Sequence, residues 1–111
     1  MLNDMKEENN RMSVDIILHE ASLVLQAARQ HASELSEVGV TMDEFNHMRV
    51  LIARVAANNY TSLGNKLDFL DEVHELKILK EVIFRMAEMR FGHTSEVLSE
   101  FKYTAQQELI V

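Results

Sequence analysis

Cysteine and proline are both absent from the 111 residues of this chain. The absence of cysteine excludes disulfides, thiolate chemistry and cysteine-ligated metals. Glycine occurs only three times, at Gly39, Gly64 and Gly92, and each lies at a break in the apolar pattern. The segments between these breaks are dominated by Leu, Ala, Met, Glu, Lys and Arg, which favour helix. The sequence therefore predicts an all-α protein.

Basic residues and long apolar runs are also scarce. The chain has 11 Lys and Arg against 18 Asp and Glu, which gives a net charge of −7. Nucleic-acid binding needs a basic surface that neutralises phosphates, so this composition argues against it. No segment approaches the roughly 20 apolar residues of a membrane span, and residues 1–11 lack the apolar region of a signal peptide. We therefore expect a cytoplasmic protein with no membrane partner.

The clearest positive pattern is an apolar seam between Ser13 and Val38, with alternating steps of three and four residues. The seam consists of Val14, Ile17, Ala21, Val24, Ala28, His31, Leu35 and Val38. His31 is its only polar position. The pattern indicates an amphipathic helix that Ser13 caps and Gly39 ends. We predict a flexible polar leader at residues 1–12, followed by a single domain at residues 13–111.

Three further helices are predicted, at residues 42–58, 66–90 and 96–109. Thr41 and Glu44 have the spacing of a capping box at the start of the first. One kinked helix over residues 42–90 is the alternative to a break at residues 58–65. Because the turns are short, consecutive helices should lie antiparallel. The predicted fold is an antiparallel up-down-up-down four-helix bundle, which we expect to be dimeric.

The predicted helix at residues 66–90 has more apolar surface than one bundle covers, because its apolar residues span more than half of its circumference. Such a helix is central in its bundle, or it buries one side in the bundle and a second side against another chain. The candidate interface residues are His31, Asn59, Ile78, Val82, Met86 and Met89. His31 and Asn59 are polar positions within seams, where a polar residue fixes register, meets a core partner or responds to pH.

Few residues have the spacing of a metal-binding or catalytic motif. Glu44 and His47, and likewise Asp71 and His74, have the spacing found in carboxylate–histidine metal bundles. These residues lie away from the centres of their seams, so we predict no metal and no other cofactor. No glycine-rich phosphate loop or nucleophile elbow is present. We therefore expect a protein without enzymatic activity.

The leading interpretation is a small helical protein that binds another protein through an apolar helix face, as an adaptor, chaperone-like or regulatory factor. A carboxylate–histidine metal-binding bundle is one alternative. A helical DNA-binding regulator is the other, because Arg49 and Arg54 lie in the second of two helices joined by a short turn. Asp43 and Glu44 begin that helix and would face phosphates unfavourably. The apolar surplus suits a homodimer interface and a partner groove equally.

Overall fold

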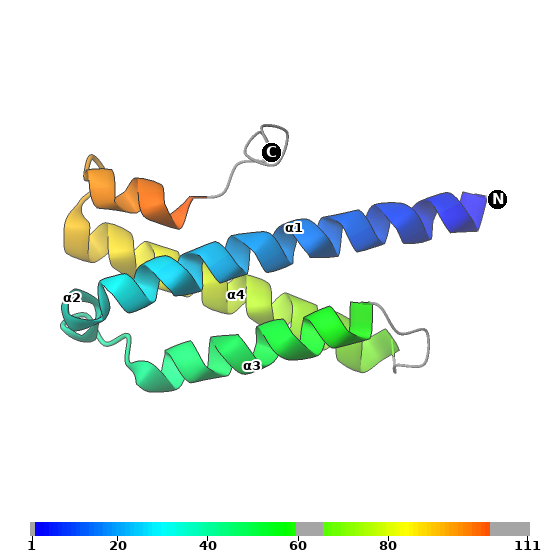
Figure 1. Cartoon of the computed structure of the whole chain (residues 1–111), viewed down its shortest axis with the longest axis horizontal. Helices are drawn as coiled ribbons and strands as arrows, with labels where there is room; N and C mark the ends of the chain where they lie inside the picture. The colour runs from blue at the N-terminus through cyan, green and yellow to red at the C-terminus, as the bar shows by residue number, and fades with distance from the viewer. Residues whose placement is uncertain (1, 60–65, 103–111) are drawn as a thin grey trace.

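Every regular element of the computed structural model is a helix within the residues that it describes, 2–59 and 66–102. The elements are α1 (Leu2–Gln30), α2 (Ala32–Ser36), α3 (Met42–Asn59), α4 (Lys66–Phe91) and the 3₁₀ helix η1 (Glu96–Phe101). The three long helices pack against one another, and η1 contacts both α1 and α4. They run in alternating directions along the molecule, and η1 lies beside α1 and α4 (Figure 1). The predicted all-α class is confirmed.

The turn between α2 and α3 follows the local signals in the sequence. Gly39 has a φ of +94°, a conformation that glycine adopts without steric cost. The amide of Val40 donates to the carbonyl of Leu35, which satisfies one of the last carbonyls of α2. At the start of α3, the backbone N–H of Thr41 donates to the Glu44 carboxylate over 2.7 Å. The Thr41 hydroxyl also donates to that carboxylate, so half of the capping box forms.

The apolar seam of the first predicted helix faces the core along its whole length. Five of its positions are buried, and Ile17, His31 and Val38 are partly buried. The largest fully buried side chains of the core are Phe45, Leu35, Met48, Leu76, Ile83 and Val55. Side chains from α2, α3 and α4 thus close over the seam of α1, as the amphipathic pattern predicts.

The bounds of the first helix differ from the prediction. α1 begins at Leu2, ahead of the predicted cap at Ser13, and its first turns extend beyond the other helices (Figure 1). It ends at Gln30, because the backbone of His31 leaves the helical region with φ −118° and ψ 34°. The chain then resumes as α2. The predicted helix at residues 13–38 is therefore two helices joined at His31.

The end of the chain also differs from the predicted fourth helix. Ser95 caps η1 by accepting a hydrogen bond from the Val97 amide over 3.2 Å. Within η1, Leu98 and Phe101 are both buried. Residues three apart lie on one side of a 3₁₀ helix, so this geometry buries both side chains on the bundle. The rest of the predicted helix, residues 103–109, lies outside the described residues.

The two central helices have the predicted bounds to within one residue. α3 ends at Asn59 and α4 begins at Lys66, as expected for two helices, while residues 60–65 lie outside the described residues. None of the helices that the structure describes is long and apolar enough to cross a membrane.

Candidate functional site

The outward side of α4 carries three large apolar side chains that the bundle leaves in solvent. Ile78, Val82 and Met89 are 51%, 44% and 73% exposed. Their spacing of four and seven residues places them on one side of the helix. We call these three residues the α4 stripe. The opposite side of α4 is buried in the core through Val73, Leu76, Ile83 and Ala87.

The α4 stripe differs from ordinary surface apolar residues by its alignment. Single exposed apolar side chains are common on soluble proteins and need no explanation. Ile78 and Met89, by contrast, lie about 16 Å apart along one helix, with Val82 between them. Leu70 is also exposed on α4, but it lies about 80° around the helix from Ile78. The other exposed large apolar side chains, such as Met42, lie on α1 or α3. The alignment gives a surface on which a second helix can lie.

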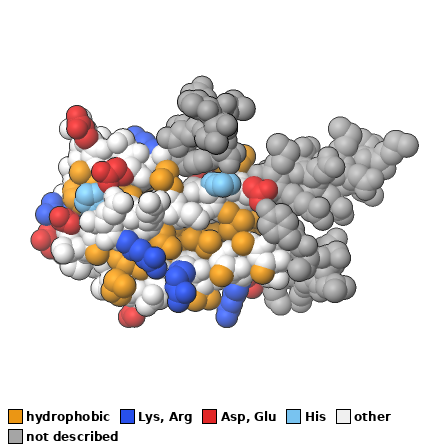
Figure 2. All heavy atoms as spheres, viewed as in Figure 1, with side chains coloured by type: hydrophobic (Ala, Val, Ile, Leu, Met, Phe, Trp, Pro, Cys, Tyr) orange, Lys and Arg blue, Asp and Glu red, His pale blue; other side chains and the backbone are white. Residues whose placement is uncertain are grey.

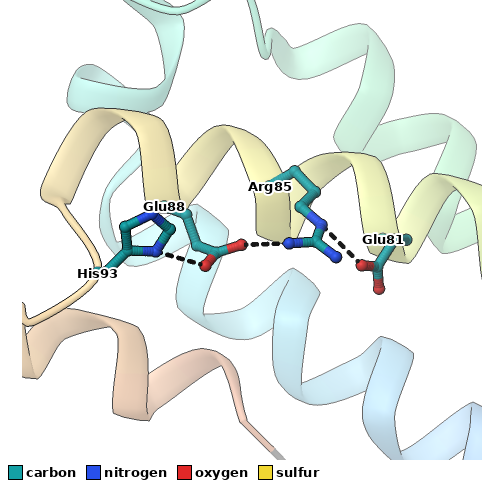
Figure 3. Close-up of polar contacts among 4 residues, drawn as sticks. All are labelled: Glu81, Arg85, Glu88 and His93. Atoms are coloured by element: carbon teal, nitrogen blue, oxygen red, sulfur yellow. Dashed lines mark hydrogen bonds and ion pairs between the residues drawn. The ribbon is translucent and has the colours of Figure 1, made fainter.

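Charged side chains border the α4 stripe. The Arg85 guanidinium reaches Glu81 through Nε (3.0 Å) and Glu88 through Nη1 (3.2 Å). Figure 3 shows these residues along α4, with His93 Nδ1 lying 3.0 Å from the other oxygen of Glu88. Nearer the start of α4, Glu75 Oε1 lies 2.7 Å from Nε2 of His47 on α3. An apolar centre with a charged rim is typical of protein–protein interfaces.

Two of the other predicted interface residues lie elsewhere. Met86 is partly buried and packs against the core, because its position on the helix wheel lies to one side of the stripe. Asn59 is the last residue of α3, and its side chain lies outside the described residues.

His31 has its contacts within the chain. The centroid of its ring lies 5.3 Å from that of the Phe91 ring, edge to face, and 6.3 Å from that of the Phe101 ring, nearly stacked. Its Nε2 lies 2.7 Å from Oε2 of Glu100, and the side chain is 21% exposed. His31 thus joins the end of α1 to the end of α4 and to η1. The one sequence signal for this cluster is the pair Phe91 and Phe101 on either side of the last turn, since aromatic residues are scarce in this chain.

A shallow groove between α1 and α3 forms a second surface. It is lined by Ser22, Leu25, Gln26, Arg29, Gln30, Arg49 and Ile52. Figure 2 shows Lys and Arg side chains beside hydrophobic surface on this face. Among the described residues, Arg29 and Arg49 have no carboxylate partner. Two guanidiniums over an apolar floor can hold a carboxylate or a phosphate.

The groove gives little support to the DNA-binding alternative. Arg54 does not line it, because five residues separate it from Arg49 and a helix turns through about 140° over that distance. Proteins that bind DNA by charge make several phosphate contacts, whereas this groove offers two arginines.

The carboxylate–histidine pairs do not form a shared ligand set. Glu44 accepts hydrogen bonds from Thr41, and these bonds lower the pKa of Glu44 below its usual value. His47 instead contacts Glu75 on α4. Across the described ranges, no group of three or more His, Cys, Asp or Glu side chains is arranged to hold a metal ion.

No protein-family model matches this chain, and no curated protein or solved structure matches it either. Its function is therefore inferred from its own surface.

Proposed function

We propose that this chain is a non-enzymatic, cytoplasmic helical protein that acts by binding another protein through the α4 stripe, as an adaptor, chaperone-like or regulatory factor. The observation that carries the proposal is the alignment of Ile78, Val82 and Met89 in solvent on one side of α4. A partner helix laid along them removes apolar surface from water. Since these side chains are 44–73% exposed, each contributes about 1 kcal/mol when covered.

The proposed frame is an antiparallel up-down-up-down bundle in which η1 begins the fourth element. In this frame α1 and α3 pack on the buried side of α4, which supports use of the opposite side for a partner. The proposed contact at the α4 stripe is one in which an amphipathic helix packs on another through apolar residues spaced by three, four and seven positions. A dimeric state belongs to the same proposal, because self-association covers the same type of surface.

The test is a pull-down from a lysate of the native host with three immobilised forms of the whole chain. These are the wild type, Val82→Glu in the α4 stripe, and Met42→Glu as a matched control, since Met42 is 57% exposed on α3. Circular dichroism verifies that both variants keep their helices. We expect proteins retained by the wild type and by M42E to be lost from V82E. Equal retention by V82E, or no protein retained by the wild type, contradicts the proposal.

A further inference from the structure

We propose that the protein bound at the α4 stripe is a second copy of this chain, with the two α4 helices antiparallel. The inference rests on the proposed function of the stripe and names its partner. The stripe belongs to a longer series with steps of four and three, the spacing of a two-helix seam. The series consists of Asp71, Glu75, Ile78, Val82, Arg85 and Met89, and all six side chains are exposed.

An antiparallel pair related by a two-fold axis level with Lys80 brings this series into register with itself. Ile78 of each copy then lies opposite Val82 of the other, which gives an apolar centre of four side chains. Lys80 does not obstruct the contact, because it pairs with Glu20 on α1, on the far side of the helix. The two bundles thus lie back to back, with α1 and α3 of each on the outside.

The same register pairs opposite charges on both sides of the apolar centre. Glu75 of each copy lies level with Arg85 of the other. Each group has an atom available: Glu75 uses Oε1 for His47, and Arg85 uses Nε and Nη1 for its own helix. The Glu75 and Arg85 side chains are 54% and 67% exposed, so both can be reached from outside the bundle. A guanidinium and a carboxylate placed in this way form a charge-assisted hydrogen bond.

These charges select the antiparallel orientation and its register. In a parallel pair, Glu75 would lie opposite Glu75 and Arg85 opposite Arg85, and like charges in contact disfavour a complex. A slip of seven residues in either direction removes Arg85 from Glu75. The apolar residues alone do not make this distinction, so the charges supply the specificity.

The inference is tested by sedimentation of the whole chain with charges reversed singly and in combination. Glu75→Arg places arginine opposite arginine, and Arg85→Glu places glutamate opposite glutamate. Each variant alone should self-associate at least about tenfold more weakly than the wild type. An equal mixture of E75R and R85E should form a heterodimer, because every arginine then faces a glutamate. Lys77→Glu is the control, since Lys77 is exposed on α4 outside the series, and it should leave self-association unchanged.

A second readout does not depend on the charges. Because the chain has no cysteine, Ile78→Cys and Val82→Cys introduce the only thiols. Oxidation of a mixture of the two variants should give mainly the disulfide between Cys at 78 and Cys at 82. Each variant alone should crosslink less, because identical positions lie about 6 Å apart along the seam.

Three results would overturn the inference. These are a wild type that is monomeric at about 1 mM, single charge reversals that self-associate like the wild type, or a mixture of E75R and R85E that forms no heterodimer. If one of these occurs while V82E still loses proteins in the pull-down, the stripe binds a different protein and the proposed function stands. If the mixture of E75R and R85E forms a heterodimer while the pull-down shows no difference between the wild type and V82E, the self-association stands and the binding of a different protein fails.

Discussion

The His31 cluster gives a prediction whose size follows from its contacts. His31→Ala removes an edge contact with Phe91, a stacked contact with Phe101 and the hydrogen bond to Glu100. Each aromatic contact of this kind contributes about 0.5–1.5 kcal/mol, and we take the lower half of that range for both. The hydrogen bond adds about 0.5 kcal/mol, at the low end of its range, because the Glu100 side chain is 46% exposed. We expect H31A to lower the free energy of unfolding by about 2 kcal/mol.

The matched variant is Glu100→Ala, which removes the hydrogen bond and leaves the ring between the two phenylalanines. We expect E100A to cost less than about 1 kcal/mol. Both are measured by urea denaturation at one fixed protein concentration, because association shifts apparent stability. A cost for H31A no greater than that for E100A would refute the packing argument. The sedimentation of H31A should match that of the wild type, since its contacts are within one chain.

Two further predictions concern the turn before α3. Gly39→Ala should lower the free energy of unfolding by about 1–2 kcal/mol, seen as a lower melting temperature, because the φ of +94° disfavours any side chain. No atom lies within 4 Å of the added Cβ, so a larger loss would point to a different cause. The stability advantage of the wild type over Glu44→Ala should be present at pH 7 and shrink in urea titrations below about pH 4.5. The pKa of Glu44 is lower in the folded state than its usual 4.5, so its contribution is lost as pH falls through the folded value. An advantage that stays constant down to pH 3 would exclude the carboxylate as its source.

The features of this fold that the sequence predicts are local ones. The cap at Thr41 and Glu44 and the left-handed glycine at Gly39 depend on residues within one turn of each other. The buried seam of α1 depends only on periodicity, which follows directly from helix geometry. These signals depend only on residues close in the sequence, and they are the ones that the structure bears out.

The features that the sequence does not predict depend on distant residues. The break at His31 has no local cause, since neither proline nor glycine is near it. The groups around the His31 ring come from Phe91, Glu100 and Phe101, far along the chain. In the same way, the spacing of three between the buried residues Leu98 and Phe101 fits an α-helix and a 3₁₀ helix alike.

The candidate site was predicted only in part, for a reason that lies in α4 itself. An excess of apolar residues shows that some of them remain outside the core, but it does not show which. Met86 and Met89 are one turn apart, yet Met86 packs against the core and Met89 is 73% exposed. The rotation of α4 that separates them is set by contacts with α1 and α3, which the periodicity of α4 does not contain.

The limited extent of the α4 stripe links the two proposals, because one surface serves both a second copy and another protein. Stable interfaces use about 20–30 residues from each partner, whereas the self-associating series has six. The dimer should therefore be weak and should exchange readily, and a protein with a longer apolar helix should displace the second copy. Competition then predicts that the apparent dissociation constant for such a protein rises once the total chain concentration passes the dimer dissociation constant. The measurement is a titration of the pull-down partner at several fixed chain concentrations, compared with the same titration using R85E. We expect this rise for the wild type to be absent for R85E, whose self-association is weakened. An apparent dissociation constant that stays unchanged for a self-associating wild type would show that the second copy and the partner occupy different surfaces.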